Sequence, residues 1–244
     1  MKKPIIPSMD IIGNKIIAVA KKDGLKNAFE NIYTYMIDGT KSSRKPFHYC
    51  TLATIENNIP QQRTMVSQKV INDKNNVYKK IRFHADSRSP KMLHIDNEKI
   101  NPKFASCIFY EPKHKIQIRM IGLINKAAVI DVQDTWENDM TDLSKRCYFN
   151  PLPPSSRISS FDDFKINHEK MIHNSGSNAN LSSSFDIIEF NIHSIEFLVL
   201  GIHGHIRARQ YIIDNDDENV DHHDVHHINY YKEGLYLSED WLSP

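Results

Sequence analysis

The 244-residue sequence predicts a mainly β (α+β) protein, an antiparallel β-barrel with peripheral helices. Three observations support this fold class. Six or more segments from residue 48 onward alternate apolar and polar residues with period two, and most of them follow one another through short turns, as in hairpins. Helical spacing occurs only beside these segments. No glycine-rich turn joins a strand to a helix, which excludes Rossmann and P-loop folds.

The first clear element is a helix, because apolar residues between Leu25 and Ile37 recur at helical spacing and Gly39 supplies a stop. We expect residues 1–24 to be an N-terminal extension of the domain. Period-two patterning then predicts strands over residues 48–56, 61–70 and 79–85. The first two strands are joined at Asn57-Asn58, a short turn of hairpin type.

The middle of the chain mixes strands and helices. Pro90 lies near the first turn of a short helix over residues 90–97. Strands follow over residues 104–110 and 115–130, and Gly122 is expected to mark a bulge or a close approach in the longer one. A polar helix is predicted over residues 132–147. The next stretch, residues 150–157, contains three prolines and is expected to be irregular.

The C-terminal part returns to strands, which we predict over residues 185–191, 195–200, 207–213 and 230–237. Residues 158–184 and 214–229 are expected to be mobile loops, because they are polar and rich in Asn, Ser, Asp or His. There is no internal repeat, and we expect residues 1–244 to form a single domain.

Charge and cysteine content exclude several classes of protein. The chain has 31 Lys+Arg and 30 Asp+Glu, a net charge of +1, which disfavours a nucleic-acid-binding role. This balance hides a polarity, since residues 61–126 hold 14 Lys+Arg and 5 Asp+Glu (net +9) whereas residues 184–244 hold 3 and 12 (net −9). Cys50, Cys107 and Cys147 form no CxxC pair, which is typical of free thiols in a reducing compartment, and we expect a cytoplasmic protein. No apolar run reaches the ~20 residues of a membrane helix.

A phosphate-binding segment is predicted within the basic stretch. The sequence Ser87-Arg88-Ser89-Pro90-Lys91 combines two cations, two hydroxyls and the free N–H groups of a helix start. A phosphate monoester requires charge-assisted donors of this kind. The alternative is a solvated helix cap with scattered surface charges.

Seven short motifs stand in a characteristic order along the chain: Cys50–Thr54, Gln62–Val66, Phe83–Lys91, Gln117–Gly122, Pro154–Arg157, Ile195–Phe197 and Trp241–Pro244. In this order they resemble the pyridoxamine 5′-phosphate oxidase family of FMN-binding split barrels, in a divergent branch rather than the authentic vitamin B6 oxidases. The resemblance covers about residues 25–244. It implies an antiparallel split β-barrel, FMN as cofactor, a homodimer with the flavin at the subunit interface, and oxidoreductase activity.

The resemblance also implies which residues bind FMN. Arg63, Arg88 and Lys91, together with Ser87 or Ser89, match the phosphate ligands. The residues that match family positions along the flavin ring are Thr64, Met65, Val66 and Ser67. His84 matches a position beside the ring where the family has a hydroxyl residue. From the second subunit, Gln117 and Ser155 match cofactor contacts, and either Arg207 or Arg209 matches a flavin-site arginine. Lys69 stands one residue later than the family's lysine, and Leu198 replaces the family's tryptophan.

The substrate side departs from the family. Authentic oxidases hold the substrate phosphate with a Tyr-x3-Arg-x3-Ser pattern, and the equivalent residues here are Trp136, Met140 and Ser144. Loss of the arginine removes an anchor worth roughly 1.5–3 kcal/mol. We therefore expect a substrate other than pyridoxine phosphate and assign no catalytic residue. Two interpretations of Trp136 stay open: it lines the pocket, or it packs the helix.

Two alternatives stay open for function. The first is a non-catalytic flavin- or haem-binding protein for storage, sensing or haem utilisation, in which His203, His205 or the histidines of residues 222–227 could ligate haem. The second concerns the same 222–227 cluster, whose paired imidazoles and carboxylates could bind Zn, Ni or Cu. The flanking Asn, Asp and Val residues favour a solvated hairpin loop instead, and we expect no metal there.

Overall fold

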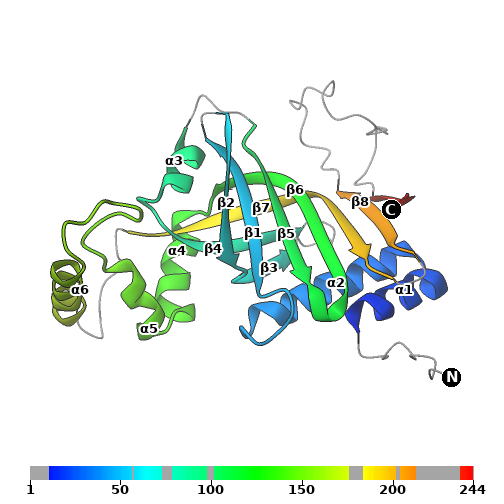
Figure 1. The fold of residues 1–244 in the computed structure, drawn as a ribbon, viewed down its shortest axis with the longest axis horizontal. Helices are drawn as coiled ribbons and strands as arrows, with labels where there is room; N and C mark the ends of the chain where they lie inside the picture. The colour runs from blue at the N-terminus through cyan, green and yellow to red at the C-terminus, as the bar shows by residue number, and fades with distance from the viewer. Residues whose placement is uncertain are drawn as a thin grey trace.

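In the computed structural model, the residues described are 11–56, 58–72, 79–97, 102–175, 184–201, 204–212 and 237–243. Together they form one antiparallel sheet of nine strands, with helices at its margins (Figure 1). The strands are β1 (Tyr49–Glu56), β2 (Ile59–Val66), β3 (Lys69–Asn72), β4 (Lys79–Asp86), β5 (Phe104–Glu111), β6 (Ile116–Lys126), β7 (Phe185–Val199), β8 (Ile206–Ile212) and β9 (Leu237–Leu242). Their order is β2-β1-β5-β6-β7-β4-β3, and β8 pairs with β7 and β9. The predicted fold class is confirmed.

The sheet is curved because its two ends are neighbours in the chain. Strands β2 and β3 lie at opposite ends of the pairing order, yet only Ser67 and Gln68 separate them. The Ser67 N–H donates to the His48 carbonyl at 2.8 Å, on the β1 side, and the Gln68 N–H donates to the Arg82 carbonyl on β4 at 3.0 Å. The chain therefore passes from one edge of the sheet to the other at this point. One strand predicted over residues 61–70 is two strands for this reason.

The β1–β2 hairpin is confirmed, with Glu56 paired to Ile59. Asn58 has a positive φ of 62°, which asparagine tolerates better than most residues in a tight turn. The hairpin aligns Arg63 with Leu52 and Thr64 with Thr51 across the two strands.

The β6–β7 pair contains a bulge beside Gly122, as expected. Ile121 pairs with Ser194 and Gly122 with Ile192, so the extra residue, His193, lies on β7. A Cβ on Gly122 would overlap the carbonyl oxygen of Asn191. The bulge bends β7 where it crosses Gly122. Strand β7 is one continuous strand of 15 residues, where we predicted two, because β6 keeps pairing with it on both sides of the bulge.

Two N-terminal helices lie beside the barrel (Figure 1). The predicted helix is confirmed as α2 (Leu25–Thr40), which packs Phe29 against Phe197 of β7 with ring centroids 5.3 Å apart. Residues 12–23 of the expected N-terminal extension form helix α1 (Ile12–Asp23). Ile12 and Ile16 of α1 are buried in the main core, so this helix belongs to the domain.

The polar helix predicted over residues 132–147 is broken into four pieces. These are α4 (Val129–Asp134), a π-helical turn η2 (Thr135–Asp139), α5 (Asp142–Lys145) and a 3₁₀ turn η3 (Arg146–Tyr148). The break has a local cause, since the Thr141 hydroxyl accepts the Ser144 N–H at 3.2 Å and caps a new helix. Trp136 and Met140 pack with Phe185 in a second, smaller core.

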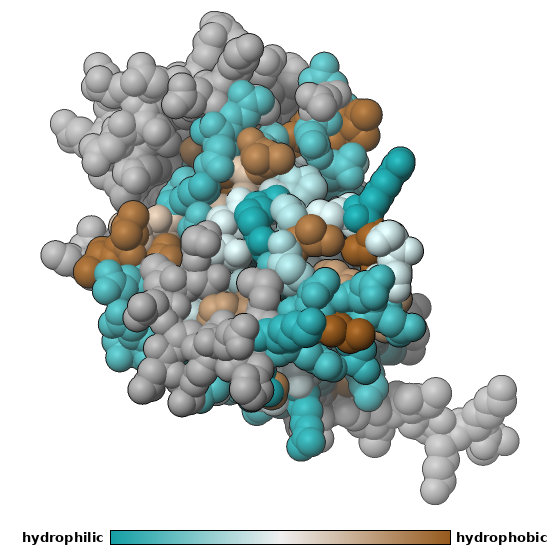
Figure 2. Space-filling view, turned by 90° about the vertical axis from the view of Figure 1, so that its left-hand side faces the viewer, coloured by the Kyte–Doolittle hydropathy of each residue, from teal (hydrophilic) through white to brown (hydrophobic). Residues whose placement is uncertain are grey.

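Residues 158–184 are not a loop throughout, because residues 161–175 form helix α6 (Phe161–Ser175). The Ser160 hydroxyl accepts the Asp163 N–H at 3.3 Å, and two acidic residues in the first turn favour the helix dipole. Figure 1 shows α6 at the end of the molecule farthest from α1. Figure 2 looks onto this end, where the described residues show separate apolar patches divided by polar ones.

The remaining elements are α3 (Pro90–Asp96), close to the predicted helix, and a 3₁₀ turn η1 (Pro112–His114). The predicted loop over 214–229, the His-rich residues 222–227, His203 and most of the strand predicted over 230–237 lie outside the described residues. No helix in the described part of the chain is long and apolar enough to span a membrane.

Candidate functional site

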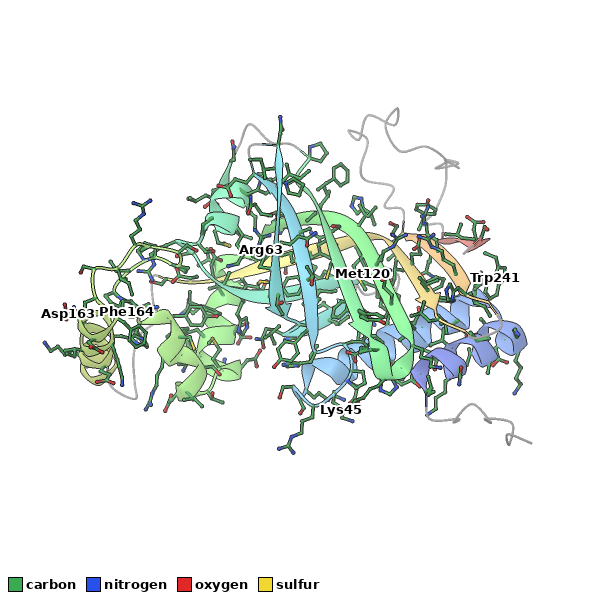
Figure 3. All side chains as sticks on the ribbon, viewed as in Figure 1. Lys45, Arg63, Met120, Asp163, Phe164 and Trp241 are labelled. Atoms are coloured by element: carbon green, nitrogen blue, oxygen red, sulfur yellow. The ribbon has the colours of Figure 1, made fainter. Side chains whose placement is uncertain are left out.

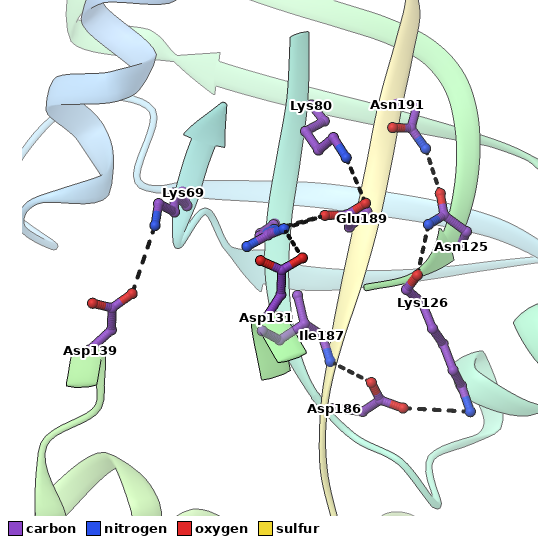
Figure 4. Close-up of polar contacts among 11 residues, drawn as sticks. Lys69, Lys80, Asn125, Lys126, Asp131, Asp139, Asp186, Ile187, Glu189 and Asn191 are labelled. Carbon is purple, nitrogen blue, oxygen red and sulfur yellow. Dashed lines mark hydrogen bonds and ion pairs between the residues drawn. The ribbon is translucent and has the colours of Figure 1, made fainter. Parts of the chain in front are cut away.

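Two of the basic residues that were compared with the family, Lys69 and Arg88, are already ion-paired, and so is Arg82 on the neighbouring strand β4. The Arg82 guanidinium lies between the carboxylates of Glu189 and Asp131, at 2.7 and 2.9 Å. Lys69 pairs with Asp139 at 3.8 Å (Figure 4). Because Asp131 belongs to α4, the Arg82 contacts attach the α4–η3 segment to the sheet, and Arg82 has a structural role.

Arg88 is the third paired cation. Its Nε and Nη2 atoms donate to the two carboxylate oxygens of Asp86 at 3.0 and 2.7 Å, and Nη1 donates to the Asn150 carbonyl at 3.1 Å. Burial alone would raise the pKa of Asp86, but the hydrogen bonds from Arg88 outweigh it and hold this pKa below its ordinary value. The structure thus supports Arg88 as a phosphate ligand less directly than the two cations that follow.

Arg63 and Lys91 form no ion pair with any carboxylate among the described residues. Arg63 Nη1 donates to the Thr54 hydroxyl at 2.7 Å, and Lys91 Nζ donates to the Ser89 hydroxyl at 3.0 Å. Burial lowers the pKa of both side chains, and the nearby Arg63 charge lowers that of Lys91 further. Figure 3 shows Arg63 in the part of the barrel near α3, the helix that carries Lys91. Two half-buried cations that repel each other favour an anion between them.

The turn between β2 and β3 supplies a further polar group. Ser67 is fully buried, and its hydroxyl has no hydrogen-bond partner among the described residues. A buried polar atom of this kind costs free energy unless something else bonds to it. Of the other residues predicted along the ring, Met65 points into the core, Thr64 is exposed and Val66 is partly buried.

His84 is mostly buried on the outward side of β4, and burial lowers its pKa to about 4, although Asp139 opposes the shift. The ring meets Phe185 edge-on at a centroid distance of 5.1 Å. His84 is therefore a neutral imidazole at pH 7, with one nitrogen that donates and one that accepts.

We expect His84 to make folding stability fall with acidity. Its pKa is about 6.5 when unfolded and about 4 when folded, so below pH 6.5 the unfolded state binds the proton more strongly. The stability lost between pH 6.5 and pH 4 is about 3 kcal/mol, and nothing is lost above pH 7. Urea unfolding of the wild type and His84→Gln at pH 7 and pH 4.5 measures this, and equal losses in both proteins would contradict it.

Gln117, predicted to act from the second subunit, lies on the outer face of the sheet together with the two candidate flavin-site arginines. Gln117, Leu198 and Arg207 form one cross-strand row on β6, β7 and β8. Arg209 lies in the next row on the same face, and both arginines bind Glu196, so the structure does not choose between them. Gln117 and Leu198 are both partly buried.

Within one chain, the predicted residues do not form a single site. Arg63 is paired to Leu52, which is fully buried, so its side chain starts from the inner face of the sheet, whereas Gln117 and Arg207 lie on the outer face. Ser155 is exposed, has a φ of 68°, and belongs to no helix or strand. One face or the other must be completed by a second chain if all of these residues touch one cofactor.

Two polar residues near these sites gave no signal in the sequence. His94 lies three residues after Lys91 on α3, is buried, and has no hydrogen-bond partner for either ring nitrogen among the described residues. Glu196 is 4% exposed and accepts hydrogen bonds from three arginines. Alternating polarity marks Glu196 as outward-facing, but its partners are brought together only by strand pairing.

The open question about Trp136 is decided by burial. It is 1% exposed and packs against Tyr148, Phe149 and Phe185, so it packs the second core. Met140 is buried beside it.

In the described ranges, no three metal-ligating side chains lie together.

Comparison with known proteins agrees with this geometry. The family model described as pyridoxamine 5′-phosphate oxidase, FMN-binding domain, matches residues 26–128. A pyridoxamine 5′-phosphate oxidase-related, FMN-binding protein of Nostoc punctiforme has a TM-score of 0.61 at 18% identity, over 88% of this chain and 96% of that one. PhzG of Burkholderia lata, solved with tetrahydrophenazine-1-carboxylic acid, also has a TM-score of 0.61, at 13% identity over 90% of each chain. No curated protein sequence matches significantly.

The family model and the solved structures thus identify this chain as similar to the pyridoxamine 5′-phosphate oxidase-like FMN-binding proteins, in sequence over residues 26–128 and in split-barrel fold over most of its length.

Proposed function

We propose that this protein is an FMN-dependent oxidoreductase, active as a homodimer with a flavin at each subunit interface. The observation that carries the proposal is the pair Arg63 and Lys91, two half-buried cations without a carboxylate partner among the described residues. The FMN phosphate is a dianion that such a pair would neutralise. The family match over residues 26–128, which includes both cations, supports FMN as the ligand.

The donors around the two cations fit a phosphate. Ser89 is 2% exposed and already binds Lys91, so its hydroxyl lies at the site. The unpartnered Ser67 hydroxyl, at the end of the strand predicted to lie along the flavin ring, would gain a hydrogen-bond partner when the ring is bound. These groups bind and orient the cofactor, and His84 offers a neutral imidazole beside it.

The two faces of the sheet support a dimer. Gln117 and Arg207 lie on the outer face and would reach a flavin bound on the inner-face cations of another chain. The same face exposes Tyr110, directly opposite Gln117, and Ile121, each more than half exposed. Apolar side chains on an outward sheet face favour association with a second copy. Free thiols at all three cysteines fit a cytoplasmic location.

Bound FMN would supply two-electron redox chemistry, while the protein contributes position and charge. The substrate differs from pyridoxine phosphate in this proposal, because Trp136 and Met140 are buried and leave no arginine at the substrate-phosphate position. Turnover of pyridoxine phosphate at a rate comparable with authentic oxidases would overturn this part.

We expect the purified protein to show the paired visible absorption bands of oxidised flavin, or to acquire them stoichiometrically when apo-protein is mixed with FMN. Size-exclusion chromatography with light scattering is expected to give a dimer. A Soret band would instead establish the haem-binding alternative, and no saturable FMN binding would overturn the proposal. Anaerobic bleaching by NAD(P)H then identifies a reductase, whereas a flavin that no reductant bleaches identifies a passive binder.

A further inference from the structure

An arginine cluster occupies the outer face of β6, β7 and β8. It consists of Arg119, Arg207 and Arg209 around the buried carboxylate of Glu196. Arg119 Nε and Arg207 Nε donate to one carboxylate oxygen at 2.9 and 2.8 Å, and Arg209 Nη2 donates to the other at 2.8 Å. The three side chains come from neighbouring strands, so their positions are set by the sheet.

The cluster carries more positive charge than its carboxylate can neutralise. Three guanidinium groups surround the single carboxylate of Glu196. Asp240 on β9 lies opposite Arg209 in the strand register, but the two form no ion pair among the described residues. Arg209 also donates to the Tyr211 hydroxyl at 2.8 Å. The arginine side chains stay 45%, 25% and 34% exposed, so donors of each remain within reach of a ligand.

This cluster is separate from the phosphate site of the same chain. Arg63 starts from the inner face of β2, whereas Arg119 and Arg207 start from the outer face of β6 and β8. Because the two groups start from opposite faces of the sheet, one anion cannot contact both within one chain.

We propose that the arginine cluster binds an oxyanion group, a carboxylate or a phosphate, on the substrate. The assignment to the substrate rests on the proposed function, because it places the cluster beside the flavin in the dimer. Arg119 lies two residues from Gln117 on the same face of β6, about 7 Å along the strand. A molecule whose acid group is held by the cluster could therefore reach a ring contacted by Gln117. The buried Glu196 holds the guanidinium groups in place before the ligand arrives, which reduces the cost of binding.

The test uses two probe anions, benzoate for a carboxylate and inorganic phosphate for a phosphate. Each is titrated calorimetrically into the apo-protein and the FMN-loaded protein at constant ionic strength. We expect saturable binding of at least one probe, weakened about tenfold or more in Arg119→Gln, because one of the three guanidinium groups and its charge-assisted donors are lost. Arg119→Lys keeps the charge but not the planar fork, and we expect an intermediate affinity.

The matched control is Arg44→Gln, which removes the same charge at an exposed position away from the cluster. Equal weakening by both variants would mean non-specific attraction and would overturn the proposal, as would the absence of saturable binding. FMN stoichiometry, read from the visible spectrum, tests the proposed function separately. Probe binding without FMN binding would support the anion site and overturn the flavin function. FMN binding without probe binding would support the flavin function and overturn the anion site.

Discussion

Lys91→Gln and Arg63→Gln are each expected to weaken FMN binding by roughly 10- to 100-fold, the value of one charge-assisted contact to a phosphate. The two residues are neighbours, so the double variant should lose less than the product of the single losses. Because burial and the Arg63 charge both disfavour a protonated Lys91 in the folded state, removing its charge should not destabilise the apo-protein. Fluorescence titration of apo-protein with FMN measures the affinity, and thermal unfolding measures the stability.

Lys113→Gln is the matched control, since Lys113 is an exposed lysine in the turn between β5 and β6. It is expected to leave FMN affinity unchanged. Lower affinity together with lower stability in Lys91→Gln would show that Lys91 supports the fold, and unchanged affinity would show that the phosphate lies elsewhere, for example on Arg88.

Gly122→Ala is expected to give the largest loss of stability of any single methyl addition to the sheet, about 3 kcal/mol or more. The new Cβ would overlap the carbonyl oxygen of Asn191, a backbone atom of the paired strand, and no rotamer change relieves that overlap. Strands β6 and β7 would have to separate at the bulge, in the middle of the barrel. Urea denaturation monitored by tryptophan fluorescence measures the change.

Ile121→Ala is the neighbouring control. Ile121 is 54% exposed on the outer face, and its truncation should change the stability of the monomer by about 0.5 kcal/mol. A Gly122→Ala protein as stable as this control would contradict the close approach of the two strands.

Strands could be predicted well because their signal is local. Alternation of buried and exposed residues gives β1, β4, β5 and β8 close to their observed ends. The exceptions have tertiary causes. Strand β7 runs without interruption because β6 pairs with it through the bulge at Gly122, and the predicted strand 61–70 divides where the chain crosses between the two edges of the sheet.

Helices were predicted less completely because their signals are weaker. In α1, the buried residues Ile12, Ile16 and Ala20 lie on one face, but prolines before them and lysines between them obscure the pattern. Helix α6 is polar overall and is stabilised locally by Ser160 and two acidic residues, and its few apolar residues are outnumbered by the polar ones between them. The segment after β6 was predicted as one helix because its polar pattern is continuous. The cap at Thr141, which starts a new helix there, gives no break in that pattern.

The phosphate segment shows the limit of sequence analysis at a site. Arg63 lies on strand β2 and Lys91 in the first turn of helix α3, as the sequence predicted. The carboxylate partners of the neighbouring cations lie at very different sequence separations, from two residues for Arg88 to 107 for Arg82. Arg82, Arg88 and Lys69 are neutralised by these partners, and Arg63 and Lys91 have none among the described residues.

By itself, the sequence determined the mainly β class, most strands, the hairpin at Asn58, the special position of Gly122 and the family resemblance, because these depend on residues close together in the chain. Only the tertiary structure decided which cations are neutralised, that Trp136 packs a core, and that Glu196 gathers three arginines on the outer face. The physical reason is that charge pairing and burial depend on side chains that approach through strand register, and register is a property of the whole sheet.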